Sequence, residues 1–222
     1  MTKDLTDDWS SAKLHKALPD EMFSVIRDTY VSHIVIPKNK LKKQIILCPV
    51  GMVGAGKSTV TIPLAKKLDL LRISTDEIRK LLKENSFNFD RAREIAGSIA
   101  IDYLQKGYSI AVDANCGSVE TKRLIEEVEK KYDILPIWFL VDPPVEFIKN
   151  KLKNFNHTWL FRDGDDALRA FSRYEEKYMG KINNWAELSV DFIYTFDTSK
   201  ENIADQIDEC YEKIIDKISK TA

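Results

Sequence analysis

The hydrophobic residues of this chain follow two patterns that alternate along its length. Short, nearly continuous apolar runs predict five strands, at 45–48, 70–74, 109–113, 134–141 and 192–196. Apolar residues that recur every three or four positions predict helices at about 19–34, after 58, from 75, and at 90–106, 119–131, 144–153 and 201–218. Alternating apolar strands and helices indicate an α/β fold, with a five-stranded, doubly wound parallel sheet covered on both faces.

Residues 1–43 precede the first strand and form an N-terminal helical extension to a domain that covers 44–222. Pro19, followed by two acids, marks the first turn of the helix in this extension. Its apolar residues recur at helical spacing and are Met22, Val25, Ile26, Tyr30 and Ile34. We expect this stripe to pack on the core, and docking of a partner or substrate is the alternative.

Charge and composition exclude several classes of protein. The 34 basic side chains nearly balance the 35 acidic ones, so net charge gives no reason to expect a nucleic acid or membrane partner. The three cysteines lack metal-ligand spacing, which favours a reducing compartment. The first residues are polar and no run of about 18 apolar residues occurs, so we expect a cytoplasmic protein. The sequence leaves the oligomeric state open.

The run GMVGAGKST, from Gly51 to Thr59, joins the first predicted strand to the next helix. Its spacing is that of a P-loop, in which glycines let backbone N–H groups turn toward a phosphate and Lys57 supplies a charge. The helix that follows adds the positive end of its dipole. The predicted nucleotide-phosphate site comprises Gly51, Val53, Gly54, Ala55, Gly56, Lys57, Ser58 and Thr59, and Ser58 is also the predicted Mg²⁺ ligand.

Two acidic residues follow predicted strands. Asp113 ends the strand expected beside the first one, where a carboxylate can hold Mg²⁺ or its water, although a solvated acid is the alternative. Asp76 follows the second strand, at the edge where open α/β sheets bind ligands, and could instead be an ordinary helix-start acid. The guanine-reading motif Asn-Lys-x-Asp does not occur, so ATP is the expected nucleotide.

These motifs together carry a resemblance to a known group of enzymes. The P-loop, the run Ser74-Thr75-Asp76-x-x-Arg79 and the strand end Asp113-x-Asn115 resemble P-loop phosphotransferases. That group includes 5′-polynucleotide kinase, zeta-toxin-type sugar-nucleotide kinases, chloramphenicol phosphotransferase and gluconate kinase. The resemblance covers residues 44 to about 215. It implies a P-loop NTPase fold like that of nucleoside-monophosphate kinases, with ATP and Mg²⁺ as cofactors.

The resemblance also implies roles for single residues. In such kinases the acid that matches Asp76 is the general base, which accepts the proton of the acceptor hydroxyl and orients it toward the γ-phosphate. Arg79 and Asn115 are the implied substrate contacts, although Arg79 could simply pair with Asp76 one turn away. Thr198 follows the fifth strand, where similar kinases hold adenine, and a helix N-cap in this segment is the alternative.

The stretch at about 149–185, between the fourth and fifth strands, is the expected helical lid. Arg169 and Arg173 share one helical face there, and an arginine over the γ-phosphate would stabilise transition-state charge. Both are therefore candidate catalytic residues, with Arg162 ranked lower. A surface pair between Asp165 and Arg169 is the alternative.

The lid also holds an alternating aromatic run after three lysines, consisting of Phe155, His157, Trp159 and Phe161 after Lys149, Lys151 and Lys153. Aromatic rings beside lysines suit a protein that stacks bases and attracts phosphates, which makes Trp159 a candidate substrate contact. Burial in a small lid core is the alternative. His157 has no neighbour that indicates a role.

The sequence thus predicts an ATP- and Mg²⁺-dependent kinase that transfers the γ-phosphoryl group to a hydroxyl acceptor. The best candidate acceptor is the 5′-hydroxyl end of a single-stranded polynucleotide. The alternatives are a small molecule such as a sugar, a nucleotide sugar or an antibiotic, and a switch that binds ATP without catalysis.

Overall fold

The computed structural model describes residues 15–155, 161, 163–178, 185 and 188–221. Its centre is one five-stranded parallel sheet in the order β2-β3-β1-β4-β5. The strands are β1 (Ile45–Gly51), β2 (Leu71–Ser74), β3 (Ile110–Asp113), β4 (Leu135–Val141) and β5 (Phe192–Phe196). The chain starts in the middle, moves to one edge and then builds the other edge. This arrangement confirms the predicted doubly wound sheet.

Both long strands continue through a proline. All seven residues of β1 are buried, and the strand passes Pro49, which pairs with Phe139, before it ends at Gly51. The carbonyl of Pro49 accepts a bond from the N–H of Cys116, 2.8 Å away. Pro136 is the second residue of β4 and pairs with Ile46.

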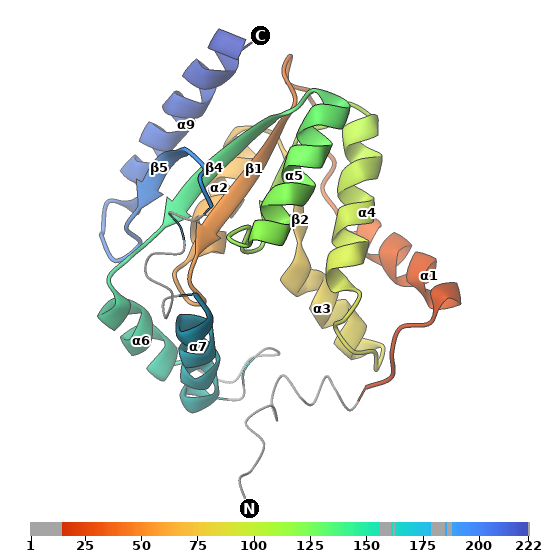
Figure 1. Cartoon of the computed structure of the whole chain (residues 1–222), viewed down its shortest axis with the longest axis vertical. Helices are drawn as coiled ribbons and strands as arrows, with labels where there is room; N and C mark the ends of the chain where they lie inside the picture. The colour runs from red at the N-terminus through yellow and green to blue at the C-terminus, as the bar shows by residue number, and fades with distance from the viewer. Residues whose placement is uncertain (1–14, 156–160, 162, 179–184, 186–187, 222) are drawn as a thin grey trace, which may run out of the picture.

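Eight helices of the described chain surround or flank this sheet (Figure 1). They are α1 (Asp20–Val31), α2 (Lys57–Lys67), α3 (Thr75–Glu84), α4 (Ala92–Gln105), α5 (Val119–Tyr132), α6 (Val145–Lys153), α7 (Gly164–Tyr178) and α9 (Ile203–Thr221). Each predicted helix is present, with ends that differ by a few residues. The N-cap of α3 is Ser74, whose side chain accepts from the N–H of Glu77.

The helices bury two apolar clusters, one on each face of the sheet. Ile45 and Leu47 of β1 face the cluster formed with α2, α6, α7 and α9. Ile46, Cys48 and Val50 face the opposite cluster, formed with α1, α3, α4 and α5. Neighbouring residues of β1 therefore belong to different cores, as the alternation of side chains along a strand requires.

Helix α1, in the N-terminal extension, packs on the same face as α3 and α4. Ile26 and Tyr30 are 2% and 6% exposed, and both belong to the core cluster of that face. Arg27 binds Asp102 on α4 as an ion pair. The predicted packing of this helix is confirmed, although Val25 lies outside the buried stripe and is 49% exposed.

The predicted lid corresponds in part to α6 and α7, which lie side by side beyond the carboxyl end of β4 (Figure 1). Phe161 is 5% exposed, and Phe155 meets it edge-to-face with ring centroids 5.9 Å apart. These two aromatic residues form lid core, which was the alternative for the aromatic run. Trp159, His157 and Arg162 lie outside the described residues.

Candidate active site

The candidate site lies where β1, β2 and β3 end. β1 runs into the P-loop at Gly51, and the last residues of β2 and β3, Ser74 and Asp113, are paired neighbours. Gly54 and Gly56 have φ angles of 79° and 94°, a left-handed conformation that glycine adopts without strain. The predicted strand, loop and helix are therefore present in the order that a phosphate site requires.

Lys57 lies at the start of α2 and reaches back over the loop. Its ammonium group donates to the carbonyl oxygens of Gly51 and Met52, at 3.0 and 2.8 Å. Burial lowers the pKa of this lysine to about 8, while the negative charges of Asp76 and Asp113 oppose the shift. A poorly solvated cation beside the P-loop suits an anionic ligand such as a phosphate.

Ser58 and Asp113 form the predicted metal-binding pair. The Ser58 hydroxyl donates to Asp113 Oδ1 at 2.8 Å, and the carboxylate is 5% exposed at the end of β3. Among the described residues, no three His, Cys, Asp or Glu side chains gather closely enough to hold a metal by themselves. Mg²⁺ prefers oxygen ligands and commonly completes its shell with water and substrate phosphates, so these two oxygens fit it together with a nucleotide.

Arg72, on β2, is a residue of this site that the sequence did not single out. Its Nε donates to the second oxygen of Asp113 at 2.7 Å, and its Nη2 binds Glu77 at 2.7 Å. Arg72 lies within a run of residues whose apolar character predicts only a strand, and it belongs to no recognisable motif. Only the pairing of β2 with β3 brings Arg72 beside Asp113.

Asp76 lies in the first turn of α3 and forms an ion pair with Arg79, 2.7 Å away. The carboxylate is about half exposed and the guanidinium is mostly buried. The pairing anticipated for Arg79 is therefore present, while its contact with a substrate stays a prediction. The negative charge of Asp76 raises the pKa of Lys57, against the effect of burial.

Asn115 connects three parts of the site. Its Oδ1 accepts from the N–H groups of Gly51 and Gly117, at 3.2 and 3.1 Å. Its Nδ2 donates to the hydroxyl of Tyr174 on lid helix α7, at 3.1 Å. The predicted substrate contact of Asn115 stays untested, and the structure gives this amide a second task, which is to join the P-loop to the lid.

The segment after β5 also touches the P-loop. Thr198 Oγ1 donates to the carbonyl oxygen of Ala55 at 2.6 Å. A Cβ atom at Gly56 would lie 3.1 Å from the Thr198 methyl group, so the two segments are in close contact. Thr198 therefore lies beside the P-loop, as the prediction of a nucleotide contact requires.

The lid contributes a lysine that the sequence analysis did not single out from its neighbours. Lys151, on α6, donates to the carbonyl oxygen of Gly54 at 3.3 Å, and burial lowers its pKa. Arg169 instead forms an ion pair with the buried Asp166 on its own helix, and Arg173 is exposed on α7. The roles predicted for these two arginines stay predictions.

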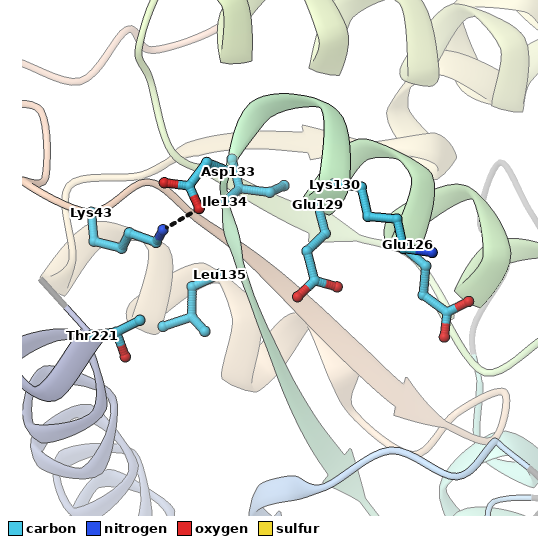
Figure 2. Close-up of a pocket in the computed structure, with 8 residues that line it drawn as sticks. All are labelled: Lys43, Glu126, Glu129, Lys130, Asp133, Ile134, Leu135 and Thr221. Carbon is cyan, nitrogen blue, oxygen red and sulfur yellow. Dashed lines mark hydrogen bonds and ion pairs between the residues drawn. The ribbon is translucent and has the colours of Figure 1, made fainter.

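A separate surface concavity lies at the opposite, amino-terminal end of the sheet (Figure 2). It is lined by charged side chains of α5 and the residues next to it, and by Lys43, which binds Asp133 at 2.8 Å. None of the predicted site residues lines it. Within the described part of the chain, no helix is both long and apolar enough to cross a membrane.

The loop, the acids beside it and the strand order define the class of this protein as a P-loop protein with an α/β kinase fold. A family model described as AAA domain matches residues 46–158, just over half of the chain, and the chain therefore belongs to this family. The comparison with curated proteins gave no match.

Several solved structures are similar in fold. A structure from the PezAT chromosomal toxin–antitoxin system of Streptococcus pneumoniae has a TM-score of 0.57 at 14% identity, over 91% of this chain and 96% of that one. A shikimate kinase from Acinetobacter baumannii in complex with shikimate gives 0.51 at 13%, over 79% and 95%. A gluconokinase from Sinorhizobium meliloti 1021 gives 0.50 at 12%, over 82% and 97%. At these identities the likeness shows the fold alone.

Proposed function

We propose that this protein is an ATP- and Mg²⁺-dependent kinase that transfers the γ-phosphoryl group to a hydroxyl of a small polar acceptor. The observation that carries the proposal is the position of Asp76. The Asp76 carboxylate is half exposed just after β2, and its negative charge raises the pKa of Lys57. It can therefore accept a hydroxyl proton beside bound phosphates. A protein that only binds nucleotide has no need of this acid.

The other residues divide the remaining tasks. Lys57 and the backbone N–H groups of the P-loop bind the phosphates, and Ser58 with Asp113 holds Mg²⁺ or its water. When bound, Mg²⁺ would supply positive charge to the phosphates of ATP. The acceptor oxygen attacks the γ-phosphorus, its proton passes to Asp76, and ADP leaves with the electrons of the broken bond. Lys151, with Arg169 or Arg173, supplies positive charge from the lid to the transferred phosphoryl group.

The size of the acceptor is inferred from two observations. Two solved structures with this fold are named as kinases of small molecules, gluconokinase and shikimate kinase. In addition, Phe155 and Phe161 pack on the lid core, so these rings do not form the base-stacking surface that a polynucleotide would use. These observations favour the small-molecule alternative over the 5′-hydroxyl polynucleotide end.

The test is transfer of labelled γ-phosphate from ATP to a panel of acceptors. The panel contains sugars, polyhydroxy acids, nucleotide sugars, and RNA and DNA with 5′-hydroxyl ends. We expect label on a small hydroxyl compound and at least about a 100-fold loss of transfer in Asp76→Asn, because general-base catalysis contributes roughly 10²- to 10⁴-fold. Binding of Mg²⁺ and ATP should persist in this variant.

Arg79→Met breaks the same ion pair and keeps the carboxylate. Because Arg79 is also a predicted substrate contact, this variant should act mainly on KM for the acceptor, whereas Asp76→Asn should act on kcat. An equal loss of kcat in both variants would assign the effect to the pair and remove the general base. Label on an oligonucleotide would restore the polynucleotide acceptor. Nucleotide-dependent binding of another protein, unchanged in Asp76→Asn and without any transfer, would identify a switch.

A further inference from the structure

A buried tyrosine of the N-terminal helix reaches the candidate site. The Tyr30 hydroxyl accepts a hydrogen bond from the backbone N–H of Ser74, 2.8 Å away. It also approaches Glu77 Oε2 at 3.3 Å, to which it can donate. Ser74 and Glu77 lie on either side of Asp76, so one side chain of α1 binds both flanks of the proposed general base.

The bond to Ser74 fills a gap at the edge of the sheet. β2 is the edge strand of the described sheet, and the N–H of Ser74 points away from β3, its neighbour there. A buried N–H without an acceptor is costly, and Tyr30 supplies the acceptor from outside the sheet. Ser74 is also the N-cap of α3, so the same tyrosine fixes the point at which strand becomes helix.

A second branch leads from Tyr30 to the metal pair. Glu77 binds the Tyr30 hydroxyl with one carboxylate oxygen and Arg72 with the other. Arg72 in turn holds one oxygen of Asp113, whose other oxygen accepts from Ser58. The hydroxyl of an α1 residue is therefore joined by consecutive contacts to the residues proposed to hold Mg²⁺.

We propose that Tyr30 is a positioning residue of the active site, and that α1 belongs to the catalytic machinery as well as to the core. The hydroxyl holds the β2–α3 turn, which places Asp76, and steadies Glu77, which orients Arg72 and Asp113. This inference rests on the proposed kinase function, in which Asp76 must lie within hydrogen-bond reach of the acceptor.

Tyr30→Phe tests the role because it removes one oxygen and keeps the ring in the core. Arg27→Met is the matched control on the same helix, since Arg27 binds Ser98 and Asp102 on α4 and does not touch the β2–α3 turn. Both variants loosen the docking of α1. Only Tyr30→Phe strips the acceptor from Ser74.

Two readouts are measured on the full chain. Amide hydrogen exchange of peptides that cover 72–78 should become at least about tenfold faster in Tyr30→Phe, because a buried N–H loses its partner. Transfer should show kcat lower by about tenfold, with KM for ATP changed less than about twofold. Arg27→Met should change each readout less than twofold.

Equal effects of Tyr30→Phe and Arg27→Met on both readouts would reduce Tyr30 to a docking residue and overturn the proposal. If Tyr30→Phe does not fold, Glu77→Ala serves instead, because it cuts the second branch from a half-exposed site. A fall in kcat supports the proposal, and an unchanged kcat overturns it.

The two proposals fail separately because hydrogen exchange needs no acceptor. If exchange is faster in Tyr30→Phe but the unsubstituted protein transfers no phosphate, the kinase function is overturned. The claim that Tyr30 positions the β2–α3 turn then still stands. Unchanged exchange together with normal transfer would overturn the role of Tyr30 alone.

Discussion

At the scale of single residues, Lys57 shows how burial prepares a side chain for its ligand. Its ammonium group is surrounded by loop carbonyls, and burial brings its pKa to about 8, below the ordinary lysine value of about 10.4. At pH values between these two pKa values, the unfolded chain binds more protons than the folded chain. Lys57 therefore makes the free energy of unfolding of the unliganded protein rise with pH there.

Nucleotide phosphates favour the charged form of Lys57, so binding of ADP should take up protons at alkaline pH. Calorimetry in buffers with different ionisation enthalpies measures this uptake, and we expect it to grow from about pH 7 to pH 9. Lys57→Arg is the control, because arginine stays charged and should abolish the growth. Equal uptake at both pH values would show that the lysine is charged before the nucleotide arrives.

The same scale shows which site residues a sequence can reveal. Lys57 and Ser58 are fixed by a local motif, because a loop that wraps one phosphate must space its residues in one way. Arg72 and Tyr30 belong to no motif. They reach the site only because β2 pairs with β3 and α1 packs beside α3, and such contacts leave no local spacing in the sequence.

At the scale of elements, the amide of Asn115 joins lid helix α7 to the P-loop. Asn115 binds Tyr174 on α7 with its nitrogen and Gly51 with its oxygen. Lid helix α6 also meets the loop, since a Cβ atom at Gly54 would lie 2.9 Å from Leu152. We therefore expect the position of α6 and α7 to be coupled to the shape of the P-loop.

Tyr174→Phe should weaken this coupling without disturbing the loop itself. One hydrogen bond contributes about 0.5–1.5 kcal/mol, so we expect KM for ATP to rise roughly two- to tenfold, with a smaller change in kcat. Tyr194→Phe is the control, because it loses a tyrosine hydrogen bond to Glu209, 2.7 Å away, on another part of the molecule. The same rise in KM for both variants would contradict a specific lid contact.

The helices also show how much the spacing of apolar residues can predict. The pattern predicts α1 because Ile26 and Tyr30 recur at helical spacing, and the helix is present. The same pattern includes Val25, which is half exposed, since a stripe does not reveal how wide the buried contact is. The sequence predicts the lid at about 149–185 as one stretch, and α7 (Gly164–Tyr178) is not predicted there as a separate helix.

At the scale of the whole molecule, the sheet lies between the two cores, and we expect them to unfold as one cooperative unit. Adjacent residues of β1 lie in opposite clusters, and α1 adds its own side chains to one of them. Disruption of either face should therefore destabilise both.

Ile26→Ala, in α1, tests whether the two cores unfold together. Ile26 is 2% exposed, and loss of such a side chain costs about 2–5 kcal/mol of unfolding free energy. Urea unfolding followed by circular dichroism and by tryptophan fluorescence should give coincident, shifted transitions. Ile62→Ala, at a site 47% exposed on α2, should shift the midpoint far less. Separate transitions for the two probes would show that α1 unfolds on its own.

The end of α9 lies at the opposite pole of the sheet from the phosphate loop. Thr221 lines the concavity at the amino-terminal edge, beside Leu135 at the start of β4 (Figure 2). A fluorophore, a fusion partner or a surface tether attached there would point away from the lid. The protein could thus be immobilised on a sensor chip through the end of α9 with its candidate active site facing the solution.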